Sequence, residues 1–524
     1  MTLLLWLACG GPTPQDSAPV SAQVEQLDAP RLLRRASLDL RGKLPSNAEL
    51  WLVEQDPDAY PELVAEYLED PAFEDRMVEL LQERWWTKVD IFDVPPSDYF
   101  LPSSQEFPYA QSVGEEPLRL MAHVIANDRP YTEIVTADYT MANELLAEIW
   151  PLEREAGEGW TQATYVDGRP GVGVLSTNGL WWRYTTTDSN MNRSRATAMA
   201  RLLLCADYLG RPISFSEGEE VVAVEDAVKN DPYCLACHAT IDPLAANLFG
   251  FWWLSLYSRV EEESYHPERE SLAEDFLGVN PAYFGTPIAG LSELGWAMSQ
   301  DPRFYSCAVD STAELLWRRP LTAQDRATLE PLRQDFVDQG ALLKPLMAEL
   351  LQAEAYGAAP DSALHNGELR MMPPSMLESA LYQVTGFAWT ENGYAQLQND
   401  VYGYRILAGG VDGYAVTEPQ TRPGLPWALV TKRSAEIAAS KTLTQAQDGM
   451  GLLGHAPLQE GTASGEFEAV VEETFFRLTA VHLTPSELDS YAGLWDEVNA
   501  QDGPEAAWQV LFTVMLRDPR FLTY

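Results

Sequence analysis

The amino-acid sequence predicts a mainly α, multidomain protein built from repeated helical hairpins, with irregular Gly/Pro-rich connecting segments and little β structure. Its 524 residues are enough for roughly three or four domains. Hydrophobic residues make up 46% of the chain, and 16 Trp and 22 Tyr supply large apolar side chains, so packed cores are expected rather than disorder. Three segments with the same helical pattern, starting at Leu44, Leu321 and Leu483, predict the hairpins.

Each of these three segments opens with a hydroxyl residue that is followed three residues later by an acid, which is the spacing of a capping box. The pairs are Ser46 with Glu49, Thr322 with Asp325, and Thr484 with Glu487. A break follows in each segment, and a second apolar stretch then ends in an aromatic residue. The breaks contain Asp56–Pro57, Gly340 and Gly503, and the aromatic residues are Phe73, Tyr356 and Phe521. We expect antiparallel helix pairs whose leucines and aromatics form core.

Two further features complete the predicted fold. Ser375 and Glu378 have the same capping spacing, and Gly386 is placed to end the helix that they would start. The segments 166–179 and 401–426 are rich in Gly and Pro, so they are expected to be loops with short strands.

The charge balance limits the possible partners. Lys and Arg total 35 and Asp and Glu total 78, so the formal net charge is −43. Nucleic acids and anionic membrane surfaces are therefore excluded as expected partners, because both need a basic surface. A protein partner would be cationic.

The N-terminus has the features of a targeting segment. Leu3 to Ala8 is an apolar run that is too short to span a bilayer, and Cys9 follows it between small residues. We expect a lipoprotein signal and tether over 1–20, with lipid on Cys9 as the membrane attachment. The protein would then be exported to the cell envelope, in the periplasm or at the cell surface. No Lys or Arg precedes the run, which departs from such signals.

Five cysteines raise the question of how they pair. Export places the chain in an oxidising compartment, which makes a Cys205–Cys307 disulfide plausible and leaves Cys234 and Cys237 for other chemistry. The sequence leaves this pairing open.

Cys234, Cys237 and His238 form a CxxCH motif, which is typical of c-type haem attachment. The two thiols add across the vinyl groups of the porphyrin, and the adjacent imidazole becomes an axial ligand of the iron. We therefore expect one covalent haem c on Cys234 and Cys237, with His238 as iron ligand. A zinc site, a redox-active CxxC and a structural disulfide stay open as alternatives.

The residues around the motif predict a turn after His238 and offer candidates for a second axial ligand of the iron. Asp242–Pro243 predicts a turn soon after His238, and a carbonyl there would accept from the second imidazole nitrogen. The candidates for a sixth iron ligand are Met191, Met199 and His266. If none of them binds, the iron is five-coordinate and the function shifts toward catalysis or sensing.

Several segments resemble the planctomycete-cytochrome-like family of exported multidomain bacterial proteins. "YCLACHATIDPLAANLF" (233–249) is similar to its CxxCH-IDPLG signature, with Ala245 and Phe249 in place of the family's Gly and Glu. "RSRATAMARLLLC" (193–205), "DPRFYSC" (301–307) and "LLRRASLDLRGKLPSNAEL" (32–50) resemble further elements. The resemblance implies haem c and export, and it implies no reaction.

The domains expected from these features are 21–150 (helical), 151–265 (the CxxCH module), 266–360 (helical) and 361–524 (helical), after the tether. The expected function is that of an exported c-type cytochrome-like lipoprotein that transfers electrons to a redox protein partner. One alternative is a non-redox surface scaffold that binds a partner or a polysaccharide, with the CxxC as a disulfide. Another is a haem enzyme such as a peroxidase, and no catalytic residue is identified.

Overall fold

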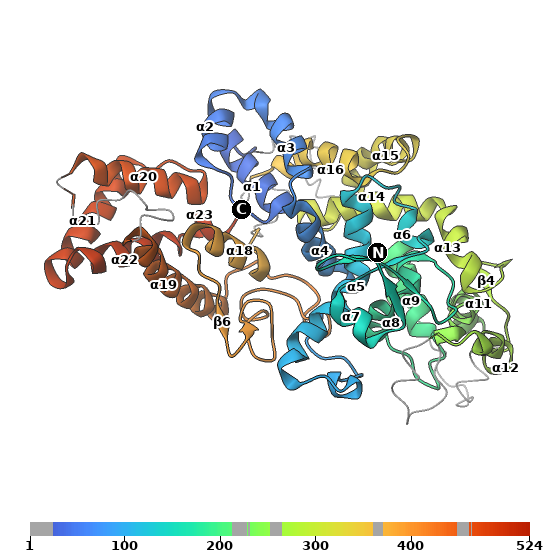
Figure 1. Ribbon diagram of the computed structural model, residues 1–524. Coiled ribbons are helices and arrows are strands. Elements are labelled where there is room, and N and C mark those ends of the chain that lie inside the picture. Colours follow the sequence, from blue (N-terminus) through green and yellow to red (C-terminus); the bar gives the residue numbers. More distant parts are fainter. Residues whose placement is uncertain are drawn as a thin grey trace, which may run out of the picture.

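The computed structural model describes residues 25–211, 228, 231–251, 265–359, 370–447, 461–462 and 464–524. The predicted fold class is confirmed, since helices form most of this structure and the strands are short (Figure 1). Cys9 and the apolar run before it lie outside the described residues.

The N-terminal region is a group of helices around α1. Its helices are α1 (Ala29–Arg41), α2 (Asn47–Gln55), α3 (Tyr60–Leu68), α4 (Ala72–Trp85) and α5 (Glu106–Ala126). Helices α2, α3 and α4 all pack on α1, and α5 packs on α4. Short 3-10 turns lie between them, at Pro57–Ala59, Pro96–Tyr99 and Ser103–Gln105.

The next region combines short helices with a small antiparallel sheet of order β1-β3-β2. Its elements are α6 (Glu133–Thr136), β1 (Thr140–Ala142), α7 (Glu144–Ile149), β2 (Leu152–Arg154), β3 (Thr161–Tyr165), α8 (Asn178–Arg183), α9 (Arg193–Leu204) and α11 (Pro232–Ala246). Thr140 pairs with Ala163, and Leu152 pairs with Tyr165. Helix α11 lies against α9 at one end of the molecule (Figure 1).

A second helical group follows and contacts both earlier regions. It contains α12 (Ala273–Leu277), the strand pair β4 (Ala282–Tyr283) and β5 (Thr286–Pro287), α13 (Leu291–Ser299), α14 (Pro302–Trp317), α15 (Ala323–Asp338), α16 (Leu343–Gln352) and α17 (Glu354–Gly357). Helix α14 packs on α9, and α16 packs on α3 and α5.

The C-terminal region projects away from the end that carries α11 (Figure 1). It contains α18 (Pro374–Thr385), the strand pair β6 (Thr390–Glu391) and β7 (Tyr394–Ala395), α19 (Leu425–Gln447), α20 (Gly465–Thr479), α21 (Pro485–Asp502), α22 (Pro504–Met515) and α23 (Pro519–Leu522). The Gly/Pro-rich segment 401–424 has turns and bends here rather than the expected short strands, and 166–179 contains one 3-10 turn, Gly173–Ser176.

The three predicted capping boxes are confirmed. Ser46, Thr322 and Thr484 each accept from the backbone N–H of their acid, and each acid accepts from the backbone of its cap. The aromatic residues that close the three segments are almost fully buried, as expected for core: Phe73, Tyr356 and Phe521.

The fourth capping prediction is wrong. Helix α18 starts at Pro374, so Ser375 lies inside its first turn and makes no cap. Proline suits the first helical position, because its fixed φ is already helical and its missing N–H is not needed there. The other half of that prediction is confirmed, since Gly386 ends the helix with a φ of 63°.

Hydrophobic side chains form two large cores. The first spans the helices from α1 to α17, and the second spans the C-terminal region from Met371 onward. Leu38 and Leu44 of the N-terminal region belong to the second core, while Phe476 and Ala480 of the C-terminal region belong to the first. The two halves of the chain therefore share apolar contacts, and the domain boundaries given above stay predictions.

A buried ionic cluster lies between these cores, around Asp39. This carboxylate is 0% exposed and accepts hydrogen bonds from the hydroxyls of Tyr356 and Tyr524, both at 3.0 Å. The guanidinium groups of Arg370 and Arg318 lie 3.7 and 3.9 Å from it. The cluster joins α1 to residues far along the sequence.

The neighbouring arginines of α1 bind backbone carbonyls instead. Arg34 donates to Leu478 and Phe521, both at 2.8 Å, and Arg35 donates to Tyr356 and Ala358. The "RR" pair of the N-terminal segment is therefore structural.

A second buried carboxylate, Glu116 of α5, has neutral hydrogen-bond partners. It accepts from the backbone N–H of Gly179 at 2.8 Å, and from the hydroxyls of Tyr165 at 2.7 Å and Thr140 at 3.0 Å. Burial raises the pKa of Glu116 to about 7, although these hydrogen bonds and the charge of Arg169 oppose the shift.

Candidate functional site

The CxxCH motif lies in the first two turns of α11. Asp231 caps this helix by accepting from the N–H of Tyr233 at 2.7 Å, and Pro232 occupies the first helical position. The helix continues through Pro243 to Ala246, so the turn expected at Asp242–Pro243 is not formed. Ile241, Leu244 and Ala245 are buried there, and this packing on α9 holds the helix together despite the proline.

The two motif cysteines are free thiols and are partly exposed. Cys234 and Cys237 are three residues apart on a helix, so their side chains share a face. His238 is four residues from Cys234 and lies on the same side. The neighbouring apolar side chains also reach solvent, with Tyr233 58% and Leu235 37% exposed, so the motif lies at the surface.

The imidazole of His238 is held by a carboxylate of its own helix. Its Nδ1 lies 2.8 Å from Oδ1 of Asp242, one helical turn further on. This corrects the expectation that a backbone carbonyl would accept from the ring. No hydrogen bond to Nε2 is present within the part of the chain that the structure describes, so this nitrogen is left for a ligand.

Asp242 is in turn held by Arg193 at the start of α9. The Nε and Nη2 atoms of Arg193 donate to its two oxygens at 2.7 and 2.9 Å. Burial acts to raise the pKa of Asp242, but the hydrogen bonds from Arg193 and His238 outweigh it and lower the pKa below its ordinary value. An ionised carboxylate only accepts, so Nδ1 of His238 carries the proton.

The residues on either side of Arg193 fix helix α9 against the chain that follows α11. The side-chain amide of Asn192 donates to the carbonyl of Leu248 at 3.0 Å, and Arg195 donates to the carbonyl of Phe251 at 3.0 Å. Phe251 is buried in the first core, as is Phe249. The position of Arg193 relative to Asp242 is therefore set by backbone contacts on both sides.

The other end of α9 is tied down by a disulfide. The structure joins Cys205, which follows α9, to Cys307 of α14 across 102 residues. The guanidinium of Arg84 donates toward the sulfur of Cys205 at 3.1 Å. Tyr208 adds a contact to α11, because its hydroxyl lies 2.9 Å from that of Thr240.

The three candidates for a sixth iron ligand occupy different environments. Met199 is buried in α9, the helix that contacts α11, and Met191 is partly buried just before α9. Nδ1 of His266 lies 3.2 Å from Glu268. The sixth ligand stays a prediction.

The residues present fit a c-type haem in their chemistry. Two unpaired thiols lie on one helical face, and the adjacent imidazole has one nitrogen engaged by a carboxylate, which leaves the other for a metal. No cluster of three or more His, Cys, Asp or Glu suited to a metal ion occurs among the residues that the structure covers.

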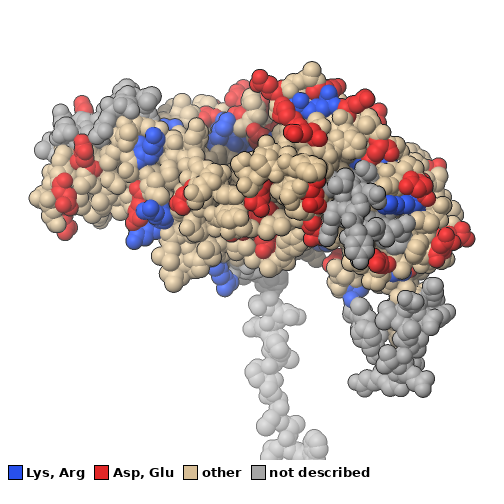
Figure 2. All heavy atoms as spheres, turned by 60° about the horizontal axis from the view of Figure 1, so that its bottom comes forward, with Lys and Arg blue, Asp and Glu red and all other residues tan. Residues whose placement is uncertain are grey.

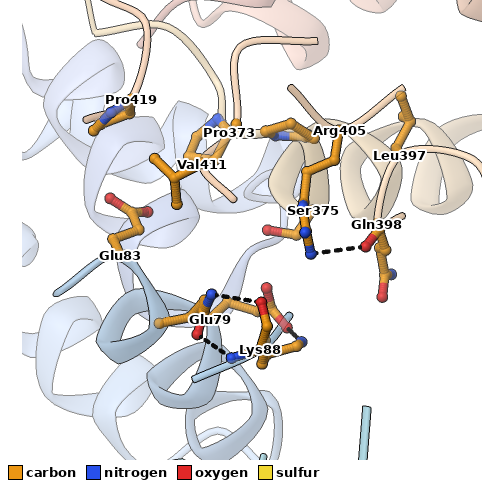
Figure 3. A pocket seen from close by; sticks show the side chains of 13 residues that line it. Glu79, Glu83, Lys88, Pro373, Ser375, Leu397, Gln398, Arg405, Val411 and Pro419 are labelled. Carbon is orange, nitrogen blue, oxygen red and sulfur yellow. Dashed lines mark hydrogen bonds and ion pairs between the residues drawn. The ribbon is translucent and has the colours of Figure 1, made fainter. Parts of the chain in front are cut away.

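A hollow of about 520 Å³, including its open mouth, lies away from the motif, between the end of α4 and the segment 373–419. Figure 3 shows Lys88 beside Glu79, with Arg405 reaching in from the other segment. The charged groups that line it have partners: Lys88 lies 2.5 Å from Glu79, Arg405 lies 2.6 Å from Asp400, and Glu83 pairs with Arg318. Arg405 also lies 3.3 Å from Asp90, and this pair joins the two halves of the chain.

Acidic side chains are spread over the face shown in Figure 2, while basic side chains form smaller groups. None of the helices within the described ranges is long and apolar enough to cross a membrane.

The sequence pointed to Cys234, Cys237 and His238, but it indicated neither Asp242 as the partner of His238 nor Arg193 as the partner of Asp242. Asp242 could have been found, because a helical assignment for 232–246 places positions 238 and 242 on one face. Arg193 is 49 residues from Asp242 and has no local signal that links the two.

Comparison with protein families gives one match. Residues 27–152 match a family described as "Protein of unknown function (DUF1592)". The match covers the N-terminal helices and includes the segment 32–50 singled out above, and it fits the family resemblance drawn from the sequence. The search of curated proteins and the search of solved structures both find no match.

Proposed function

We propose that this protein is an exported c-type cytochrome-like lipoprotein that carries one haem and transfers electrons at the cell envelope. The observation that supports this most directly is the CxxCH motif on one surface helix, with both thiols free and Nδ1 of His238 engaged. When bound, the haem would supply a reversible one-electron centre.

The chain's own residues would have distinct roles in this function. Cys234 and Cys237 would hold the porphyrin by thioether bonds, and His238 would bind the iron through Nε2. The partial exposure of both cysteines and the exposure of Tyr233 and Leu235 support this role, because electron transfer to a partner needs a haem near the surface. The net charge of −43 favours a cationic redox partner, whose association would slow as salt screens the attraction.

The first test is expression of the full chain in an exporting host together with cytochrome c maturation factors. We expect a haem that survives denaturation, a reduced α-band of the c type, and a mass increase of one haem. The Cys234→Ser, Cys237→Ser variant should lose all three. The matched control is Cys205→Ser, Cys307→Ser, which removes the other cysteine pair and should keep the haem.

The same preparation separates the alternatives. Colourless protein with a Cys234–Cys237 disulfide would contradict the proposal and favour the scaffold that binds a partner or polysaccharide. Carbon monoxide binding by the reduced protein would indicate an open iron and favour a haem enzyme such as a peroxidase. Radiolabelled fatty acid incorporation that is lost in Cys9→Ser would test the lipid anchor.

A further inference from the structure

Three side chains form a hydrogen-bonded chain that ends at the proposed iron ligand. Arg193 donates to both oxygens of Asp242, at 2.7 and 2.9 Å, and one of these oxygens lies 2.8 Å from Nδ1 of His238. The contacts link α9 to α11, so the orientation of the imidazole depends on a second helix as well as its own.

The exposure of the three side chains decreases toward the carboxylate. Asp242 is 8% exposed, while Arg193 is 21% and His238 is 25% exposed. The carboxylate is thus shielded from water, where its charge acts more strongly on its neighbours than it would in solvent. The imidazole keeps an open edge, as a ligand-binding ring requires.

We propose that Asp242 and Arg193 are positioning residues for His238, and that they set the reduction potential of the haem in opposite directions. This inference rests on the proposed function. A carboxylate that accepts from Nδ1–H makes the imidazole a stronger donor, which stabilises the oxidised iron and lowers the potential. The positive charge of Arg193 partly neutralises the same carboxylate, so it weakens the effect of Asp242 on the imidazole and raises the potential.

Three variants of the haem-loaded chain test this prediction by potentiometry. Asp242→Asn removes the charge and keeps an acceptor oxygen, so we expect the potential to rise by about 59 mV, a tenfold change in the one-electron equilibrium. Arg193→Gln leaves the carboxylate without its counter-charge, so the potential should fall. Asp231→Asn is the matched control, since it removes a charge from the same helix, keeps a capping side chain, and should shift the potential less than Asp242→Asn.

A haem-free measurement tests the positioning separately. In the Cys234→Ser, Cys237→Ser background, nitrogen NMR of the six labelled histidines should show His238 as a single tautomer with the proton on Nδ1. Adding Asp242→Asn should give a mixture of tautomers, because a neutral amide binds the ring less strongly.

The possible failures are distinguishable. If the unmodified chain takes up no covalent haem, the proposed function fails and this inference fails with it. If haem is attached but the potential and the tautomer are the same in Asp242→Asn, the inference alone is overturned. Shifts of the same sign in Asp242→Asn and Arg193→Gln would overturn the opposed roles.

Discussion

The molecule uses arginine and aspartate together in two places, with different results. Around Asp39, the carboxylate and its partners are buried, and the hydroxyls of Tyr356 and Tyr524 join α1 to residues more than 300 positions away in the sequence. Around Asp242, the pair lies near the surface and holds an imidazole with one nitrogen left open. Both carboxylates are buried, so the two sites differ in the exposure of their partners: Arg370 and Arg318 are 2% and 9% exposed, whereas Arg193 and His238 are 21% and 25% exposed.

The largest effect is expected at the buried cluster. Asp39→Asn removes the negative charge that faces Arg370 and Arg318, and a buried charge left without its partner costs about 3–5 kcal/mol of stability. Urea unfolding followed by circular dichroism would measure this loss. The control is Asp489→Asn on an exposed face of α21, which should change stability by less than about 0.5 kcal/mol. Equal effects of the two variants would contradict the distinction between buried and exposed sites.

Glu116 differs from Asp39 and Asp242, because it is a buried carboxylate whose direct hydrogen-bond partners are neutral. Burial raises its pKa from 4.5 to about 7, so the folded chain binds more protons than the unfolded chain between these values. The resulting stabilisation is complete at low pH and is lost as the pH rises through about 7. The contribution of this group should fall by at most about 3 kcal/mol from about pH 5 to about pH 8.

Urea unfolding at both pH values would detect this change. Glu116→Gln should remove this part of the pH dependence, whereas Glu468→Gln on an exposed face of α20 should preserve it. A pH profile that is the same in Glu116→Gln and in the unmodified chain would show that Glu116 does not titrate in this range.

The smallest effect on stability is expected at the surface pair. Asp242→Asn should cost only about 1 kcal/mol, because Arg193 and His238 are partly solvated and can bind water once the charge is gone. The measurement is the same urea unfolding as for Asp39→Asn. A loss as large as that of Asp39→Asn would mean that Asp242 holds the fold rather than the imidazole.

The sequence predicted the features that depend on local contacts. The capping boxes at Ser46, Thr322 and Thr484 involve residues three positions apart, so their geometry follows from spacing alone. The capping prediction at Ser375 is wrong for a local reason, since Pro374 occupies the first helical position and leaves Ser375 inside the first turn. The turn expected at Pro243 failed because packing against α9 outweighs the preference of proline.

Features that depend on distant contacts could not be predicted in this way. Nothing near Arg193 indicates that it meets Asp242, because the two are brought together by backbone contacts from Asn192 and Arg195. In the same way, the local sequence does not predict that Arg34 and Arg35 both donate hydrogen bonds to backbone carbonyls more than 300 residues away. Charge and composition indicate which class of partner to expect, but they do not predict which residues contact one another.

The bond between Cys205 and Cys307 closes a covalent ring of chain that contains the whole of α11. A protease that cuts the backbone once inside this ring leaves two pieces that stay linked through sulfur. A single nick beside the motif would therefore release neither half until a reductant also cleaved the disulfide.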